Sequence, residues 1–269
     1  MENTVLKESE LKDRLDFAVR AARLAGGLTL DHFRCDDLTV EHKADDSPVT
    51  VADRHAEQSL RKQIDEEFPD DAILGEEFDD KHGTSGFRWI LDPIDGTQSF
   101  VHGVPLYSTL VAVEHGGESI LGVICLPALD QCVYAASGMG AWQVSGNGDP
   151  KPARVSKHTS LGEGLFLTSE VDGFSEIGRH DTYLRLQSAA RVCRTWGDGY
   201  GYAMVATGRA DLMVDPIMAV WDAGPLLPIM EEAGGTFTDW IGRPTIHSGQ
   251  GIATNGLILP EVLSLIGGE

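Results

Sequence analysis

The sequence has 269 residues, of which 42% are hydrophobic and 23% charged, and its formal net charge is −21. This length and composition exclude a disordered chain and allow one large domain or two closely packed subdomains. Because lysine and arginine are not clustered, we expect no nucleic-acid partner. No apolar run approaches the roughly 20 residues that span a bilayer, and the first residues lack the apolar stretch of a signal peptide, so we expect no membrane association.

The four cysteines, Cys35, Cys125, Cys132 and Cys193, are scattered along the chain and form no CxxC pair. Structural zinc is therefore not expected, and a disulfide framework is expected even less. This cysteine usage favours a reduced, cytoplasmic protein.

The first predicted elements are helices. Residues 11–33 place apolar side chains on one face at helical spacing, which predicts an amphipathic helix. Residues 36–49 contain turn-forming residues and are expected to form an extended arm and loop. A second helix is predicted from Val51 to about Glu67, with Thr50 as its N-cap.

Short apolar runs come next and predict strands. These runs are Ala72–Leu74, Trp89–Leu91, Tyr107–Val113 and Ile120–Leu126, and Gly116-Gly117 predicts a hairpin between the last two. Residues 145–152 are rich in turn formers and are expected to join two halves of one domain, about 1–148 and about 149–269.

The second half mixes both kinds of element. It is expected to contain a strand at Gly164–Thr168 and helices at about Asp181–Ala190, from Gly199 to about Gly208, and from Asp222 to Ala233. Because helices and strands do not alternate regularly, the pattern favours a layered α+β fold over a doubly wound sheet.

The most informative motif is the hexapeptide at 92–97, which directly follows a predicted strand. Acids at the exit of a buried strand are costly unless they are paired or bind metal. Asp92 and Asp95 are suited to hold hard cations such as Mg²⁺, which prefer oxygen ligands. Gly96 allows the backbone to approach an anion, and a helix starting near Thr97 would offer free N–H groups to phosphate. The motif indicates metal-assisted phosphoryl transfer, although alone it also suits an ordinary turn.

Two further acidic sites are less specific on their own. Glu76 and Glu77 follow another predicted strand, where solvated loop acids are also common. Asp222 follows Trp221 at the start of a predicted helix, where an acid also suits the positive end of the helix dipole.

Taken in chain order, these sites resemble the motifs of the inositol monophosphatase-like family of metal-dependent phosphatases, and the resemblance covers nearly the whole chain. Four ordered matches carry it: Lys43 with Ser47-Pro48-Val49-Thr50 and Asp53; Gly75-Glu76-Glu77; Asp92-Pro93-Ile94-Asp95-Gly96-Thr97; and Trp221-Asp222 followed by Glu232-Ala233-Gly234-Gly235. The resemblance implies a layered αβαβα sandwich, usually in a homodimer. The chain departs from the family at Ser99, where members often carry Asn, and at Gly224-Pro225, which interrupts the start of the last predicted helix.

The resemblance also implies roles for the matched residues. Two or three Mg²⁺ ions would be held by Glu76, Asp92, the Ile94 carbonyl, Asp95 and Asp222. The backbone amides of Gly96 and Thr97 would bind the phosphate. Asp53 would hydrogen-bond the Thr97 hydroxyl, and this dyad, with Glu76 and a metal ion, would activate the attacking water. The cations would reverse the local charge, so that an acidic protein binds an anionic substrate.

The segment from Arg194 to Tyr202 resembles the histidinol-phosphate phosphatase branch of the family, because Asp198 stands where inositol phosphatases usually show small neutral residues. Asp215 falls where family members place a substrate-contacting acid. Histidinol phosphate carries an ammonium group and an imidazole, so two acids in a desolvated pocket would favour it over a polyol. Arg194 is a candidate for steering the phosphate, or it simply pairs with a nearby acid.

Other interpretations of this segment remain open. Asp198 also suits the N-cap of the following helix. The aromatic residues Trp196, Tyr200 and Tyr202 either stack on an imidazole or pack in the ordinary way.

We therefore expect Mg²⁺-dependent hydrolysis of L-histidinol phosphate to L-histidinol and phosphate, as a step of histidine biosynthesis. The first alternative is another small phosphoester, such as inositol 1-phosphate, a sugar bisphosphate or an adenosine bisphosphate. A second alternative is a binding or regulatory protein that has kept the fold without catalysis.

Overall fold

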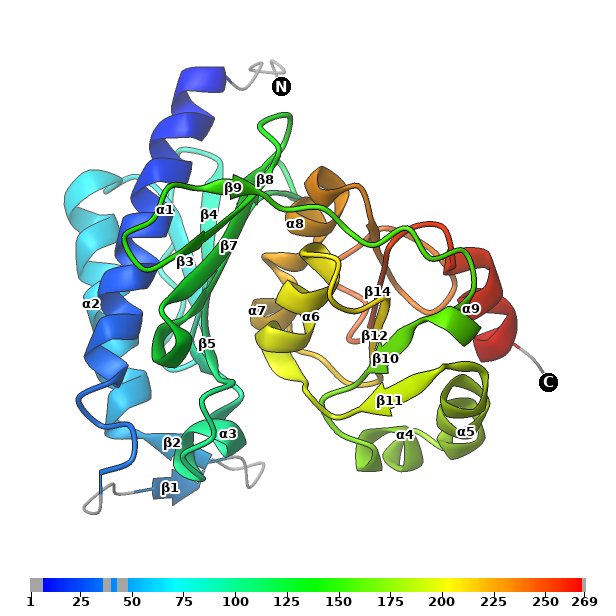
Figure 1. Ribbon diagram of the computed structural model, residues 1–269. Helices are drawn as coiled ribbons and strands as arrows, with labels where there is room; N and C mark the ends of the chain where they lie inside the picture. Colours follow the sequence, from blue (N-terminus) through cyan, green and yellow to red (C-terminus); the bar gives the residue numbers. More distant parts are fainter. Residues whose placement is uncertain (1–6, 36–39, 43–47, 268–269) are drawn as a thin grey trace.

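The computed structural model describes residues 7–35, 40–42 and 48–267 (Figure 1). Lys43 and Ser47 of the first motif lie outside the described residues. The helix predicted over 11–33 is α1 (Glu8–Thr29), and α2 runs over Val51–Glu67 with Thr50 as its N-cap, as predicted. Within the expected arm, β1 (Val40–His42) and β2 (Pro48–Thr50) pair as antiparallel strands.

The first half of the chain forms a seven-stranded sheet in the order β3-β4-β5-β6-β7-β8-β9. Its strands are β3 (Ala72–Gly75), β4 (Phe87–Asp95), β5 (Ser108–His115), β6 (Glu118–Leu126), β7 (Gln131–Ala136), β8 (Ala141–Ser145) and β9 (Lys151–Pro152). All neighbours are antiparallel except β3 and β4. The short helix α3 (Thr97–Val101) follows β4, and a 3₁₀ turn at Pro127–Leu129 joins β6 to β7.

The second half forms a five-stranded sheet in the order β11-β10-β12-β14-β13. Its strands are β10 (Leu165–Leu167), β11 (Val192–Arg194), β12 (Leu212–Asp215), β13 (Thr236–Thr238) and β14 (Gly251–Thr254). The helices of this half are α4 (Asp172–Glu176), α5 (His180–Ala189), α6 (Asp198–Ala206), α7 (Val220–Ala223), α8 (Leu226–Ala233) and α9 (Leu259–Gly267). A 3₁₀ turn at Leu161–Glu163 precedes β10. The predicted break at Gly224-Pro225 separates α7 from α8.

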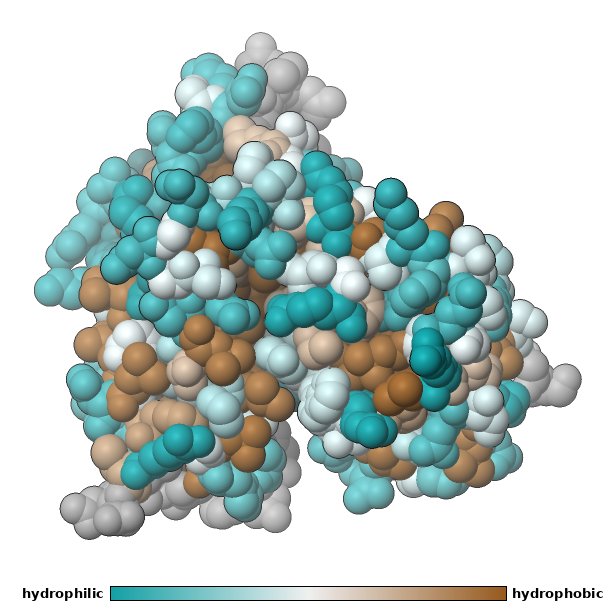
Figure 2. Space-filling view, in the orientation of Figure 1, coloured by the Kyte–Doolittle hydropathy of each residue, from teal (hydrophilic) through white to brown (hydrophobic). Residues whose placement is uncertain are grey.

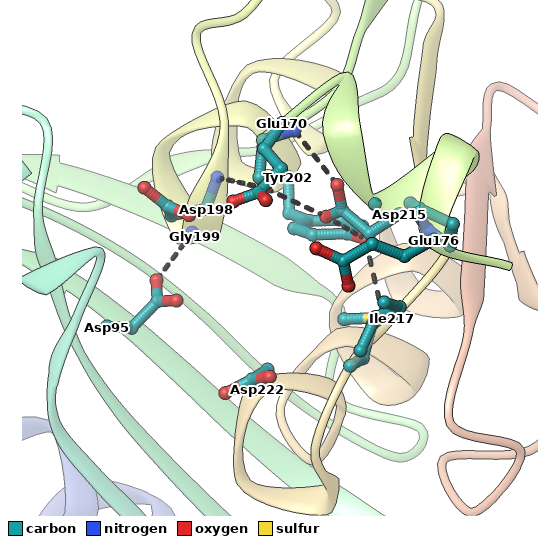
Figure 3. Close-up of a pocket in the computed structure, with 13 residues that line it drawn as sticks. Asp95, Glu170, Glu176, Asp198, Gly199, Tyr202, Asp215, Ile217 and Asp222 are labelled. Atoms are coloured by element: carbon teal, nitrogen blue, oxygen red, sulfur yellow. Dashed lines mark hydrogen bonds between the residues drawn. The ribbon is translucent and has the colours of Figure 1, made fainter. Parts of the chain in front are cut away.

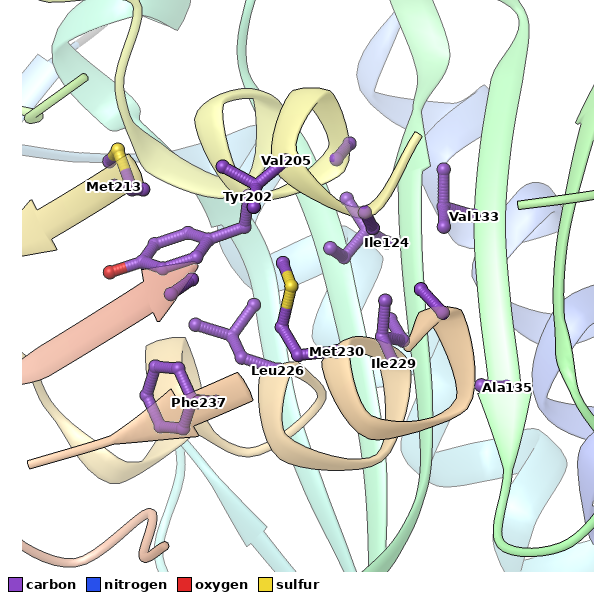
Figure 4. Packing of buried hydrophobic residues seen from close by; sticks show 14 of the residues in the cluster. Ile124, Val133, Ala135, Tyr202, Val205, Met213, Leu226, Ile229, Met230 and Phe237 are labelled. Carbon is purple, nitrogen blue, oxygen red and sulfur yellow. The ribbon is translucent and has the colours of Figure 1, made fainter. Parts of the chain in front are cut away.

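The elements stack as the expected αβαβα sandwich (Figure 1). Helices α1 and α2 cover the outer face of the seven-stranded sheet, and α6, α7 and α8 lie between the two sheets. Helices α4, α5 and α9 lie beyond the five-stranded sheet. The central layer is a continuous apolar core in which Tyr202 and Val205 of α6 face Leu226 and Met230 of α8 (Figure 4). No helix in the described part of the chain is both long and apolar enough to cross a membrane.

Two expectations from the sequence were wrong. Residues 145–152 do not join the two halves, because they include the end of β8 and all of β9, which pair with each other in the first sheet. Cys125 and Cys132 form a disulfide, whereas a disulfide framework was not expected. The two cysteines stand opposite each other in the register of β6 and β7, and strand register is set by tertiary pairing that cysteine spacing does not reveal.

Candidate active site

Three carboxylates, two of them buried and one half-buried, meet where β4 ends against α7. Asp92 and Asp95 occupy the end of β4, where the pairing with β5 shifts register, and Asp222 lies in α7. Each offers an oxygen, and these oxygens all lie within 4.8 Å of one another. Asp92 is only 2% exposed, and its Oδ1 has no hydrogen-bond partner among the described residues. An unpartnered buried carboxylate oxygen is costly, so this arrangement fits a cation held by oxygen ligands.

Electrostatics support the same interpretation. Burial raises the pKa of Asp92 well above its ordinary value, and repulsion from Glu76, Asp95 and Asp222 adds to the effect. Burial likewise raises the pKa of Asp95 to about 6 and that of Asp222 to about 7. Carboxylates this close repel one another when ionised. A bound divalent cation removes that repulsion and keeps all of them ionised at neutral pH.

Glu76 joins this cluster from the neighbouring strand. It follows β3, and its backbone N–H donates to the Leu91 carbonyl, which continues the parallel pairing of β3 with β4. A cavity of about 490 Å³ is lined by Glu76 together with Asp92, Asp95 and Asp222. The structure therefore brings together all four side chains that were predicted as metal ligands, and the Ile94 carbonyl belongs to a residue that lines the same cavity.

Gly96 and Thr97 form the turn between β4 and α3. Gly96 adopts a left-handed conformation with φ of 80°, which favours glycine. The Thr97 hydroxyl donates to the Ile94 carbonyl at 3.1 Å. Asp53 is 1% exposed, burial raises its pKa to about 6, and its Oδ2 accepts from the Thr50 N–H and hydroxyl. The expected hydrogen bond between Asp53 and Thr97 stays a prediction, as does the binding of phosphate by this turn.

Asp198 belongs to the second half of the chain and lies beside the cluster of carboxylates formed by Asp92, Asp95 and Asp222. It is the first residue of α6, whose N-cap is Gly197, and it has an unusual φ of 54°. Its carboxylate lies against Gly96, where an added Cβ would stand 2.6 Å from Asp198 Oδ2. Burial and repulsion from Asp95 and Asp215 raise its pKa well above the ordinary value. Asp198 thus lines both the 490 Å³ cavity and the adjoining one.

Asp215 lines the adjoining cavity but is already engaged within the protein. Its Oδ1 accepts from the Ser169 N–H at 2.9 Å, and its Oδ2 accepts from the Tyr202 hydroxyl at 2.9 Å and the Ser169 hydroxyl at 3.1 Å. Ser169 in turn accepts from the Asp198 N–H at 2.9 Å. This chain of bonds fixes the Asp198 backbone, so Asp215 and Tyr202 support Asp198 while also lining the smaller cavity.

Two other residues predicted to contact the substrate, Arg194 and Trp196, line neither of the two cavities. Arg194 is exposed on β11, where its guanidinium donates to the Cys193 carbonyl, and it lines neither cavity. Trp196 is 42% exposed and also lines neither cavity, whereas the neighbouring Thr195 lines the larger one. The position of Arg194 therefore gives no support to its predicted role, which stays untested.

Sequence reasoning missed one wall of the site. The adjoining cavity, of about 290 Å³, is lined by Glu170, Glu176 and Ile217 as well as by the predicted acids. Figure 3 shows the side chains of Glu170 and Glu176 on the side of this cavity that faces Asp95 and Asp222. The available signal was Ser169-Glu170 directly after the predicted strand at Gly164–Thr168. The cavity wall opposite the carboxylate cluster is therefore acidic.

Comparison with known proteins agrees with this geometry. The profile of the inositol monophosphatase family matches residues 10–266. A histidinol-phosphatase of Chlorobaculum parvum is 42% identical over 254 residues, covering 94% of this chain and 96% of the relative. A histidinol-phosphatase of Streptomyces coelicolor is 38% identical, covering 94% and 97%. The solved structure of an IMPase of Thermotoga maritima superposes with a TM-score of 0.83 at 36% identity, covering 94% and 96%.

Proposed function

The chain belongs to the inositol monophosphatase family, and from this premise we propose that it is a Mg²⁺-dependent phosphatase that hydrolyses L-histidinol phosphate. The observation that carries the proposal is the cluster of Asp92, Asp95 and the half-buried Asp222, with an unpartnered buried oxygen on Asp92. Carboxylates this close together and this little exposed to water stay ionised only beside a cation. A site whose ligand atoms are all oxygens suits Mg²⁺.

Different residues of the chain perform the separate parts of phosphoester hydrolysis. Glu76, Asp92, the Ile94 carbonyl, Asp95 and Asp222 would hold two or three Mg²⁺ ions, which would supply charge neutralisation and lower the pKa of the attacking water. The Gly96–Thr97 turn orients the phosphate through its backbone amides. Asp53, together with Thr97 and Glu76, accepts a proton from the attacking water, and its pKa of about 6 suits a base near neutral pH.

The acidic wall favours a substrate with a cationic leaving group. Asp198 lies between the two cavities, and Glu170 and Glu176 face the metal cluster across the smaller one. An ammonium group placed there meets three carboxylates, whereas a neutral polyol gains much less. The two histidinol-phosphatase relatives support this choice. The IMPase relative of Thermotoga supports the alternative, in which inositol 1-phosphate or another small phosphoester is the substrate.

The proposal also covers the protein's oligomeric state, its location in the cell and its pathway. As the family resemblance implies, the enzyme is a homodimer, and as a histidinol-phosphate phosphatase it serves histidine biosynthesis in the cytoplasm. Size-exclusion chromatography with light scattering tests the dimer, and a mass near the 29.0 kDa of one chain would contradict it.

The deciding experiment measures phosphate release from L-histidinol phosphate and from myo-inositol 1-phosphate, with Mg²⁺ and with a chelator. We expect a strong preference for histidinol phosphate that disappears on chelation. Equal or greater activity on inositol 1-phosphate would overturn the substrate and keep the metal chemistry. Activity that persists in chelator would overturn the metal-dependent mechanism itself.

A further inference from the structure

An ion pair on α2, between the buried Glu57 and the half-buried Arg61, holds the segment that carries Glu76. Glu57 is 0% exposed and lies four residues before Arg61 on the same face of the helix. Arg61 Nε donates to Glu57 Oε1 at 2.7 Å, and the other guanidinium nitrogens donate to the carbonyls of Phe78 and Asp79 at 2.9 and 3.0 Å. The second Glu57 oxygen accepts from the Glu77 N–H at 2.8 Å.

The contact between the helix and this segment is unusually close. A Cβ added to Gly75 would stand 2.0 Å from Glu57 Oε1 and 2.8 Å from Arg61 Nη2. Only glycine at this position leaves room for the pair. The segment from Gly75 to Asp79 is thus bound on one side by backbone pairing with β4, through the Glu76 N–H, and on the other by the side chains of Glu57 and Arg61.

We propose that the pair of Glu57 and Arg61, the α2 clamp, positions Glu76 as a metal ligand and thereby sets the protein's affinity for divalent cations. The inference rests on the proposed function, because it takes Glu76 to be a ligand. A carboxylate ligand must hold its oxygen in place against the repulsion of Asp92, and it does so only if its backbone is fixed. Four hydrogen bonds that converge on this short segment fix that backbone.

The α2 clamp also links the position of Glu76, the proposed metal ligand, to that of Asp53, the predicted general base. Asp53 lies one helical turn before Glu57 on α2, and both side chains are buried. Residues four apart on a helix share one face. The same rigid helix therefore places Asp53 and, through the clamp, Glu76, so that the two move together if α2 shifts.

The test measures Mn²⁺ binding to the full chain by the loss of the free-ion electron paramagnetic resonance signal, beside Mg²⁺-dependent activity. Glu57→Ala is expected to weaken Mn²⁺ binding by about tenfold to a hundredfold, the range found when partners behind metal ligands are removed. The isosteric Glu57→Gln keeps one acceptor oxygen for the Glu77 N–H but turns its amide nitrogen towards Arg61, so it should recover only part of the binding. Gly75→Ala should weaken binding as Glu57→Ala does, because its methyl group displaces the clamp with every polar group retained.

Two control variants on the same helix separate positioning from stability. Glu66→Ala removes an acid whose partner, Lys62, is also four residues away, but both side chains are exposed. Ile64→Ala removes buried packing and lowers the melting temperature without touching the clamp. Both should bind Mn²⁺ as the wild type does.

The outcomes distinguish the clamp from the proposed function. Weakened binding in Glu57→Ala and Gly75→Ala, with normal binding in both controls, supports the clamp. Normal Mn²⁺ binding in Glu57→Ala, with an active wild type, overturns the clamp and leaves the phosphatase intact. Equal weakening in Ile64→Ala shows that the effect is one of general stability and also overturns it. A wild type that binds no Mn²⁺ overturns both proposals.

Discussion

The backbone N–H of Gly199 donates a 2.6 Å hydrogen bond to Oδ2 of Asp95, 104 positions earlier in the sequence. The same oxygen accepts from Ser108 of β5. Both bonds favour the ionised form of Asp95 and oppose the effect of burial. The first turn of α6 is therefore hydrogen-bonded to the carboxylate cluster. This bond also holds Asp198, next to Gly199, beside the Gly96–Thr97 turn. One carboxylate thus links the proposed metal site to the wall proposed to contact the leaving group.

Replacing Asp95 with Asn should abolish catalysis without unfolding the protein. The variant removes one negative charge from the cation site, so we expect kcat/KM to fall by more than about a hundredfold, beyond the loss typical for residues that only support ligands. The metal-free variant should be at least as stable as the metal-free wild type, because a buried repulsion is relieved. Phosphate release and chemical unfolding in chelator measure the two effects. Near-wild-type activity would contradict the metal assignment.

The metal-free protein should lose stability as the pH rises from about 4 to 7. Asp92, Asp95 and Asp222 have raised pKa values in the folded state, with about 6 for Asp95 and about 7 for Asp222, against an ordinary value of 3.8. The folded state therefore binds more protons than the unfolded state within this window, and stability falls as those protons are lost. Urea unfolding in chelator across this range gives the slope.

Two comparisons make the pH prediction specific. Asp95→Asn removes one of the titrating groups and should flatten the slope. Added Mg²⁺ should restore stability above pH 7, because it binds the ionised carboxylates. An unchanged slope in the variant would show that other groups govern the pH dependence.

Asp215→Asn should impair catalysis through Asp198 without affecting the metal site. The amide nitrogen of Asn cannot accept the bonds from Ser169 and Tyr202, so a buried donor is left unpaired at a cost of about 1–3 kcal/mol in unfolding free energy. Ser169 then no longer fixes the Asp198 backbone. We expect a higher KM for histidinol phosphate and unchanged Mn²⁺ affinity. If Mn²⁺ binding weakened in parallel, Asp215 would instead support the metal ligands.

Removing a charge from the acidic wall formed by Glu170 and Glu176 should weaken binding only of a substrate with a cationic leaving group. Glu170→Gln and Glu176→Gln should each raise KM for histidinol phosphate by about fivefold or less, the size of a partly exposed charge pair. KM for a phosphoester whose leaving group carries no cation, such as p-nitrophenyl phosphate, should stay the same. Glu163→Gln is a matched control, because this exposed acid lies in the 3₁₀ turn before β10 and lines neither cavity. Equal effects on both substrates would remove these residues from substrate recognition.

The sequence by itself determined the elements whose signals are local. The N-cap at Thr50, the strand that leads into Asp92 and the break at Gly224-Pro225 follow from capping chemistry, apolar runs and the geometry of proline. The ordered acidic motifs likewise identified the four carboxylates that the structure gathers, because these residues follow strands or open a helix and their spacing is distinctive.

Only the tertiary structure decided which distant groups meet. The pairing of Cys125 with Cys132, the wall formed by Glu170 and Glu176, and the full hydrogen bonding of Asp215 all depend on strand register and on how the two sheets pack around α6. The grip of Glu57 and Arg61 on the Glu76 segment arises in the same way. Such contacts depend on strand register, burial and close approach, which no local pattern of residues specifies, whether the partners are seven residues apart, as the two cysteines are, or far apart in the chain.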